Sequence, residues 1–388
     1  MARRFVLICL CLALLPLQPA SAVKLDSSTV DLQEARLSPG YKRLLATAFQ
    51  RLQTWCVVNG ETSPDDLSNN AIAMANMLTR HLQYLFENQF GVSAGRQAIL
   101  CVQLRHRHLR TSLSKAWDSI KSWEQLAPIS MRVPVPWLVL EAMFVASLLR
   151  GFSAGGALGR DYISFAIGLL IGFDALLRPG ELAILTPSKI ALPDSRLHGR
   201  VASGLLTITN GKNRRVFGRI QMAATHDTRA LRWLSWLIRE MPDDARLLPG
   251  GTPKFRKIFA DVVKDIGVAG LGLTPASLRA GGATHKFSTG SLDLGQLKFR
   301  GRWAVLSTLE HYVQECTATL VMLRLGNDTL TRLEKLAQFG ERFEFPPAFP
   351  WQQFFSRAKQ RVVPRSSHGP STAGLSDPAR GGDWRRVA

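Results

Sequence analysis

Apolar side chains recur every three or four positions between residues 40 and 127, which is the spacing of amphipathic helices. The pattern predicts helices over 40–58, 68–90 and 96–124. The polar segment 62–66 breaks the first helix and can cap the second. Together these segments predict a small all-helical domain over 40–127.

A second domain is predicted over 137–340, after a linker that is marked by three prolines between 128 and 136. Two apolar stretches, 137–149 and 162–177, begin this domain. Each contains one acidic residue and is shorter than the ~20 apolar residues that cross a bilayer. They are therefore predicted to be buried helices, and no stable membrane span is expected.

A β-hairpin is predicted in the middle of the second domain. Residues 205–209 have the composition of a strand, Asn210-Gly211 is typical of a tight turn, and 215–222 can form the returning strand. The fold class that follows is mainly α with a small β-sheet. Further helices are predicted at about 226–240, 254–266, 275–288 and 305–337.

The positive charge of the chain narrows the class of partner. Lys and Arg outnumber Asp and Glu by 49 to 29, which gives a net charge of +20. Such an excess favours a polyanion, most commonly nucleic acid, although basic proteins without a special partner also exist. In the 96–124 stretch, four basic side chains off the apolar stripe are candidates for contact with DNA phosphates, with a solvated charged face as the alternative. They are Arg107, Arg110, Lys115 and Lys121.

The cysteines and the two ends of the chain give separate predictions. The five cysteines lack the spacing of a zinc site or a disulfide framework, so we expect buried apolar side chains, a reducing compartment and no structural metal. Residues 1–22 combine two arginines, an apolar run and Ala20-Ser21-Ala22, which is typical of a secretory signal. The segment 345–388 is rich in Pro and Arg and is predicted to be disordered.

Cleavage of a phosphodiester without a metal ion requires three kinds of side chain. A nucleophile must attack phosphorus, fixed positive charge must stabilise the non-bridging oxygens, and an acid must protonate the leaving oxygen. Tyrosine suits the first task, paired arginines suit the second, and a lysine among cations suits the third, while an indole N–H can also donate to phosphate. The chain offers Arg178, Lys212, Arg279, Trp303 and Tyr312 for these tasks.

Two motifs resemble the tyrosine recombinases, the phage-integrase-type site-specific recombinases. Arg178-Pro-Gly-Glu181 resembles the motif of the family's first arginine. The resemblance implies that Arg178 holds the scissile phosphate and that Glu181 braces the site. Lys212 directly follows the predicted hairpin turn and is similar to the family's mobile lysine, the general acid for the leaving 5′-hydroxyl.

Two later motifs extend this resemblance, which spans about residues 40–330. The segment Ala276-Ser-Leu-Arg279 is similar to the family's second-arginine motif. Trp303 precedes Tyr312 by nine residues, as His or Trp precedes the nucleophile in the family's last motif. The resemblance implies that Arg279 and Trp303 contact the phosphate and that Tyr312 forms a 3′-phosphotyrosyl intermediate.

Several wider expectations follow from the resemblance. It implies an N-terminal helical core-binding-like domain and an α+β DNA breaking-rejoining catalytic domain. It also implies site-specific recombination or integration of double-stranded DNA, no metal or nucleotide cofactor, and four protomers assembled on DNA. A nucleus or an organelle is then the expected location, which conflicts with the secretory-type segment 1–22. The Leu-Arg-Ala-Gly-Gly-Ala-Thr variant over 278–284 is most similar to a divergent eukaryotic mobile-element recombinase.

The chain departs from the family at Ala276, where the family usually has a histidine. Alanine cannot donate to a phosphate oxygen, and the loss of one such contact costs about 10²–10³-fold in rate. His285 is half a helical turn out of phase with Arg279 and is not expected to replace the missing histidine. Enzymatic activity is therefore open. The alternatives are a DNA-binding relic of a mobile element, a type IB topoisomerase-like enzyme and a secreted basic protein.

Overall fold

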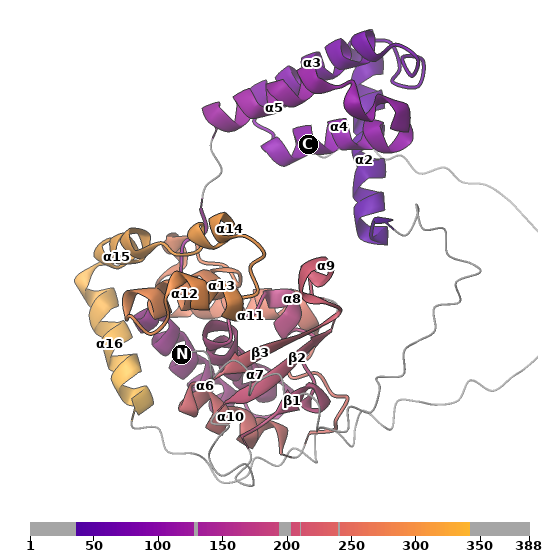
Figure 1. Ribbon diagram of the computed structural model, residues 1–388. Helices are drawn as coiled ribbons and strands as arrows, with labels where there is room; N and C mark the ends of the chain where they lie inside the picture. Colours follow the sequence, from indigo (N-terminus) through magenta and orange to yellow (C-terminus); the bar gives the residue numbers. More distant parts are fainter. Residues whose placement is uncertain (1–35, 128–130, 194–202, 210, 240, 342–388) are drawn as a thin grey trace, which may run out of the picture. The chain divides into compact units, whose positions relative to one another are not determined.

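The chain divides into two compact units, Met1–Ser130 and Met131–Ala388. The predicted leader and tail, 1–22 and 345–388, lie outside the described residues. The computed structural model describes residues 36–127, 131–193, 203–209, 211–239 and 241–341 (Figure 1).

The first unit consists of helices around an apolar core. Its first helix begins at Pro39, where the Ser38 hydroxyl accepts a hydrogen bond from the backbone N–H of Tyr41 at 3.3 Å. The second is capped by Asn70 and not by the predicted segment 62–66. The elements are α2 (Pro39–Val58), α3 (Ala71–Glu87), α4 (Val92–Arg105), the 3₁₀ helix η3 (Arg107–Thr111) and α5 (Ser114–Leu126).

The prediction of one helix over 96–124 is wrong. The backbone leaves the helical region at His106 (φ −113°, ψ 80°), so α4 ends there and α5 begins only at Ser114. A Cβ on Gly95 would lie 2.8 Å from side-chain atoms of both Ile120 and Trp123, which shows how closely α4 approaches α5. The break allows both helices to pack on one core, which a single straight helix could not do.

The two apolar helices of the second unit are α6 (Trp137–Ala154) and α7 (Gly156–Asp174). Both are long and apolar enough to cross a membrane by length and composition alone. However, 56% and 78% of their most apolar windows are buried inside the structure, where they contribute to the largest core cluster. The buried carboxylate of Glu141 accepts a hydrogen bond from Arg229 at 2.6 Å. These features support their interpretation as core helices.

A three-stranded antiparallel sheet in the order β1-β2-β3 follows these helices. The returning strand was predicted over 215–222, and this start is too early. Thr209 pairs with Ile220, and the short helix α9 (Arg214–Phe217) lies between the two strands. Gly218, at φ +83°, turns the chain after α9 toward the returning strand. A two-residue turn is therefore excluded. The strands are β1 (Ile190–Ala191), β2 (Gly204–Thr209) and β3 (Ile220–Thr225).

The single helix predicted over 305–337 is also wrong. The chain leaves the helix at His311 and re-enters it at Glu315, then breaks again before Asn327. The first break places Tyr312 in a turn. The remaining elements are α8 (Pro179–Leu182), η4 (Pro187–Lys189), α10 (Thr228–Ile238), α11 (Gly251–Asp265), η6 (Ala269–Leu271), α12 (Ser277–Ser288), α13 (Leu294–Arg300), α14 (Leu306–Glu310), α15 (Glu315–Leu323) and α16 (Asn327–Glu341).

The predicted fold class is confirmed, since the described chain is mainly helical with one small sheet. The prediction of buried cysteines holds for Cys56 and Cys101 but is wrong for Cys316, which is exposed. Cys316 lies on α15, where Val321 is the one buried residue. Most of this helix therefore lies at the surface.

Candidate active site

A small apolar cluster forms the base of the candidate site. Its buried members come from the segment just after α7, from α12, α13 and α14, and from the turn before α14. Tyr312 packs against this cluster and is itself partly buried. Segments far apart in the sequence are thereby held together. The buried members are Leu176, Ala283, Leu297, Trp303 and Leu309.

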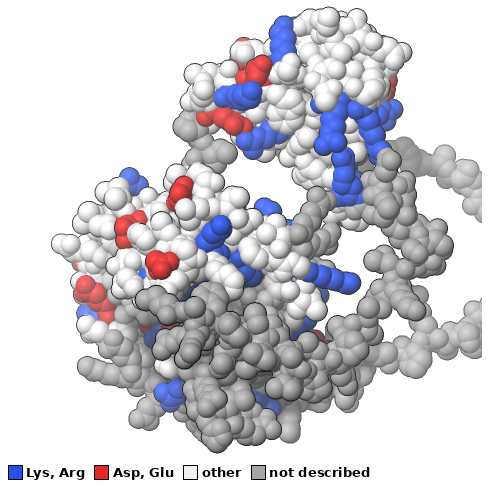
Figure 2. All heavy atoms as spheres, viewed as in Figure 1, with Lys and Arg blue, Asp and Glu red and all other residues white. Residues whose placement is uncertain are grey.

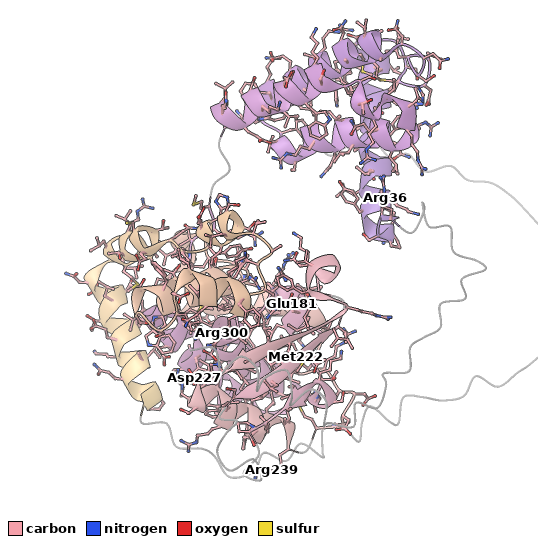
Figure 3. All side chains as sticks on the ribbon, in the orientation of Figure 1. Arg36, Glu181, Met222, Asp227, Arg239 and Arg300 are labelled. Carbon is pink, nitrogen blue, oxygen red and sulfur yellow. The ribbon has the colours of Figure 1, made fainter. Side chains whose placement is uncertain are left out.

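Arg178 and Glu181 hold one another at the start of α8. The backbone N–H of Arg178 donates to one carboxylate oxygen of Glu181 at 3.0 Å, and the Arg178 guanidinium donates to the other at 2.6 Å. Pro179 occupies the first helical position, where its missing N–H has no cost. Arg178 retains some solvent exposure, whereas Glu181 is buried. Figure 3 marks Glu181 in the second unit.

Arg302 is a third arginine that the sequence analysis did not single out. Its side chain is only 4% exposed, and its Nη2 donates to Glu181 Oε2 at 2.7 Å. One carboxylate thus lies between Arg302 and Arg178. Burial raises the pKa of Glu181, but Arg302 and Arg178 outweigh it, and the pKa lies below the usual range. The sequence did contain a signal for this residue, because Arg302 stands between Gly301 and Trp303 of the last motif.

Arg279 is the most deeply placed cation of the site. Its Nη1 donates to the carbonyl of Leu176 at 2.6 Å and its Nη2 donates to the carbonyl of Gly301. Its guanidinium carbon lies 4.1 Å from the centre of the Trp303 ring, a cation–π contact. Burial, followed by the charges of Arg178 and Arg302, lowers the pKa of Arg279 to about 9. Arg178, Arg279 and Arg302 are called the arginine cluster below.

Tyr312 lies beside the arginine cluster. Its ring centre is 5.2 Å from that of Trp303 and 5.7 Å from the guanidinium carbon of Arg279. The Thr284 hydroxyl donates to the carbonyl of Tyr312 at 3.0 Å and accepts from the backbone N–H of Gln314 at 3.1 Å. Helix α12 therefore carries Arg279 and also fixes the backbone of the tyrosine turn, residues 311–314.

Several hydrogen-bond donors of the site are buried without an acceptor. Within the described residues, Arg279 Nε, Arg302 Nε, Arg302 Nη1 and Trp303 Nε1 have no partner. Three guanidinium charges surround one carboxylate, which leaves two positive charges uncompensated. A buried unpaired donor typically costs about 1–3 kcal/mol. Both features favour an anion as the natural ligand. No group of three or more His, Cys, Asp or Glu in the described ranges could hold a metal ion.

Lys212 lies in the connection between β2 and β3 and is exposed. Its neighbour Asn213 donates from Nδ2 to the backbone carbonyl of Arg302 at 3.0 Å. The structure therefore brings the Lys212 segment to the edge of the arginine cluster, although the lysine side chain is not part of the buried network.

The fold of the chain is known from solved structures. It is similar to the Tn1549 transposon integrase in complex with circular intermediate DNA, at a TM-score of 0.51 and 12% identity over 75% of this chain and 96% of that one. The chain has the integrase fold. A second similar structure is the XerH site-specific recombinase bound to a palindromic difH substrate, with a TM-score of 0.44 and 14% identity over 77% of this chain and 78% of that one. A third is a lambda integrase dimer bound to a COC′ core site, with a TM-score of 0.39 and 11% identity over 72% of this chain and 82% of that one. No family model and no curated protein matches the sequence.

Within this integrase fold, the position of the expected histidine is occupied by a methyl group. Ala276 precedes α12 and makes no side-chain cap. His285 does not take its place, because its ring stacks on Trp137 with centres 4.7 Å apart and planes at 11°. His285 and Trp137 line a separate cavity of about 250 Å³ that no member of the arginine cluster contacts.

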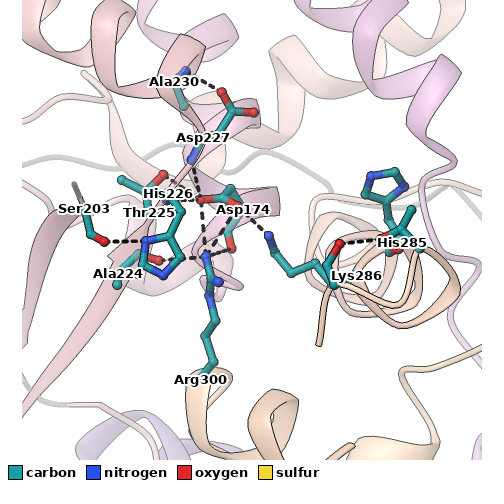
Figure 4. A network of polar contacts seen from close by, with 12 residues as sticks. Asp174, Ser203, Ala224, Thr225, His226, Asp227, Ala230, His285, Lys286 and Arg300 are labelled. Carbon is teal, nitrogen blue, oxygen red and sulfur yellow. Dashed lines mark hydrogen bonds and ion pairs between the residues drawn. The ribbon is translucent and has the colours of Figure 1, made fainter. Parts of the chain in front are cut away.

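A second polar network braces the integrase fold around Asp174, the last residue of α7 (Figure 4). Its carboxylate accepts from the Thr225 hydroxyl at 2.8 Å and from the backbone N–H of His226 at 2.7 Å. It also pairs with Lys286 at 2.5 Å and with Arg300 at 3.5 Å. Asp174 thereby joins the end of β3 to α12 and α13, the helices that lead to the second arginine and to the tryptophan turn.

We expect Asp174 to make folding sensitive to acid. Burial raises the pKa of Asp174, but Lys286 and Arg300 outweigh it and lower the pKa from 3.8 to about 2. The carboxylate then stabilises the fold by about 2 kcal/mol above pH 3.8, and this contribution is lost as the pH falls through about 2.

Urea unfolding of Asp174→Asn between pH 5 and about 2 tests this expectation. Its free energy of unfolding should fall less steeply with acid than that of the wild type. Asp118→Asn is the control, because the Asp118–Lys121 pair is exposed and contributes little. Equal slopes for Asp174→Asn and the wild type would contradict the assignment.

The four basic residues proposed to contact DNA are all exposed in the first unit. Lys115 donates to Asn76 Oδ1 at 2.7 Å, and Lys121 pairs with Asp118 at 2.8 Å. Arg107 and Arg110 belong to η3, the short element that interrupts the predicted helix. The space-filling view shows Lys and Arg side chains gathered on this unit, with a few acidic side chains among them (Figure 2).

Proposed function

We propose that the chain breaks and rejoins double-stranded DNA through a covalent bond to Tyr312, as a site-specific recombinase of the tyrosine type. The observation that carries this proposal is the arginine cluster with unpaired buried donors directly beside a tyrosine ring. The similar Tn1549 transposon integrase, solved in complex with circular intermediate DNA, supports the same proposal.

The proposed reaction is an in-line displacement at phosphorus. The phenolic oxygen of Tyr312 gives up its proton to solvent water and forms a bond to phosphorus, and the bond from phosphorus to the 5′ oxygen breaks. Lys212 donates a proton to the departing 5′ oxygen, which leaves as a hydroxyl. The 3′-phosphotyrosyl ester preserves the energy of the phosphodiester bond, which the reverse attack by the 5′ hydroxyl uses to rejoin the strand.

The charge of the site fits this transition state better than the resting phosphodiester. A phosphodiester carries one negative charge, and attack by a phenolate adds a second. The arginine cluster and Glu181 together leave two uncompensated positive charges. Groups that match the charge of the transition state more closely than that of the ground state lower the barrier. No metal is required in this scheme.

DNA binding and self-association are parts of the same proposal. We assign phosphate contacts to Arg107, Arg110, Lys115 and Lys121 of the first unit. Assembly on DNA, proposed as a tetramer, would use exposed apolar residues of α15. Leu320 and Leu323 are 52% and 75% exposed, whereas Val321 is buried and Leu325 packs against the core of its own unit.

A DNA-binding protein that no longer cuts is the second candidate. The observation that favours it is Ala276, which removes one expected donor to the phosphate. In this case the arginine cluster would bind a backbone phosphate without chemistry. The same protein should then shift DNA in a native gel and leave no covalent product.

Denaturing gels with a pool of nicked, labelled DNA at low salt distinguish the two candidates. The enzyme should yield a detergent-resistant protein–DNA band, because a nick lets the short fragment that carries the new 5′ hydroxyl leave and so traps the tyrosyl ester. Tyr84→Phe, which alters an exposed tyrosine of the first unit, should yield the same band. A pool that shifts in a native gel but gives no covalent band would favour the binding protein.

A further inference from the structure

We propose that Asn213 is a positioning residue that holds the Lys212 segment on the turn formed by residues 301–303. The inference rests on the proposed function, since it assigns a task to Lys212. It concerns a side chain that neither the motifs nor the arginine cluster includes.

The side chain of Asn213 is used in an unusual way. Asn213 is the N-cap residue of α9, a position where an Asn side chain normally accepts a hydrogen bond from its own helix. Here it makes no such cap. Its Nδ2 instead donates to the carbonyl of Arg302, 89 residues away in sequence, at 3.0 Å. The backbone carbonyl of Asn213 still accepts from Val216 and Phe217, both at 3.0 Å.

The 301–303 turn offers a fixed acceptor. The carbonyl of Gly301 accepts from Arg279, and the side chain of Arg302 donates to Glu181. Arg302 has φ +57°, a left-handed backbone that is rare for a residue with a side chain and that sets the direction of its carbonyl. Trp303 completes the turn and is almost fully buried. A segment that bonds to this turn is therefore placed relative to the arginine cluster.

The other side of Lys212 is fixed as well. A Cβ on Gly211 would lie 2.5 Å from Nε2 of Gln221, a buried residue of β3, so the backbone at Gly211 lies directly against this side chain. Lys212 thus stands between two anchored neighbours while its own side chain stays exposed. Among the described residues, the bond from Asn213 is the one hydrogen bond that joins 211–219 to the 301–303 turn.

Precise placement matters for an acid that acts in the transition state. A displacement of about 1 Å can cost about 10²-fold in rate. Without the bond from Asn213, Lys212 would sample more positions and would protonate the 5′ oxygen less often. The side-chain contacts of Arg178, Arg279 and Arg302 and the backbone contacts of Tyr312 would be retained, because Asn213 bonds only to the backbone carbonyl of Arg302.

A substrate with sulfur at the bridging 5′ position isolates this effect. A thiol has a pKa of about 8.5, so a thiolate leaves without a proton at neutral pH, whereas an alkoxide does not. We expect Asn213→Ala and Asn213→Asp to form the covalent complex about 10²-fold more slowly on the oxygen substrate and at the wild-type rate on the sulfur substrate. Lys212→Ala should show the same pattern.

Asn59→Ala is the matched control, since Asn59 in the first unit also donates from Nδ2 to a backbone carbonyl, that of Trp55, at 2.8 Å. It should leave both rates unchanged. A wild-type rate for Asn213→Asp on the oxygen substrate, or an equal loss on both substrates, would overturn the inference. A wild-type protein without any covalent product on either substrate would instead contradict the proposed function.

Hydrogen exchange of the peptide that spans 211–219 gives a second measurement that needs no activity. In Asn213→Ala and Asn213→Asp, loss of the bond should speed exchange in this peptide, while the peptide that carries Gln221 keeps its protection. Unchanged exchange over 211–219 would show that Asn213 does not hold the segment.

Discussion

Replacement of Tyr312 by phenylalanine is expected to abolish covalent attachment of the protein to DNA and to leave the fold intact. The phenolic oxygen is the proposed nucleophile, and phenylalanine lacks it. The contacts that place this residue survive the change. Its backbone N–H still donates to the carbonyl of Leu309 at 2.7 Å, its carbonyl still accepts from Thr284, and its ring still packs on Trp303.

The measurement is the yield of detergent-resistant complex on nicked DNA, with a thermal unfolding curve of the same preparations. We expect Tyr312→Phe to melt close to the wild type, to shift DNA equally in a native gel, and to give no covalent band. Tyr84→Phe serves as the control for a tyrosine outside the site. A covalent band of normal intensity from Tyr312→Phe would remove this residue from the mechanism.

Replacement of Ala276 by histidine is expected to raise the rate of cleavage by about 10²–10³-fold, the amount that one donor to a phosphate oxygen commonly contributes. Ala276 stands three residues before Arg279, directly ahead of α12, and is partly exposed, so a larger side chain can be accommodated there. The resemblance to tyrosine recombinases implies a histidine at this position, and His285 is engaged with Trp137.

Single-turnover rates of covalent-complex formation test this prediction. Ala276→Phe is the matched control, because it adds a ring of similar size without a hydrogen-bond donor. Histidine should accelerate the reaction and phenylalanine should not. If both variants react at the wild-type rate, the site does not require a donor at residue 276, and the reason for favouring a DNA-binding relic disappears with it.

The regular elements were largely predictable, because local patterns determine them. The spacing of apolar residues located the first helix within one residue of its observed start at Pro39. The strand over 204–209 was also found from its composition. The breaks were not predictable. Helices α4 and α5 are separated at His106 because both pack on one core, which is a tertiary requirement that no local pattern contains.

The residues of the candidate site could be proposed from the sequence, but their arrangement in space could not. The order of Arg178, Arg279, Trp303 and Tyr312 along the chain indicated a phosphate site, and the structure brings these four side chains together. Arg302 was missed, because its importance depends on the carboxylate of Glu181, 121 residues earlier in the sequence. Periodicity and composition carry no information about such a contact.

The turn at Tyr312 shows the same limit. A continuous helix over 305–337 was the prediction from apolar spacing, and the real chain leaves the helix over 311–314. The hydroxyl of Thr284 on α12 donates a hydrogen bond to the carbonyl of Tyr312 and accepts one from the backbone N–H of Gln314, and Tyr312 packs against the cluster that contains Leu309. These contacts over nearly 30 residues of sequence separation outweigh the local preference for helix. They also place the tyrosine ring next to Arg279.

Mapping the covalent bond tests the central claim most directly. A trapped complex would be digested with nuclease and protease, and the peptides that carry nucleotide would be sequenced by mass spectrometry. We expect a nucleotide joined through its 3′ phosphate to the side chain of Tyr312, and a released strand that ends in a 5′ hydroxyl. A nucleotide on any other residue, or a released strand that ends in a 5′ phosphate, would contradict the account.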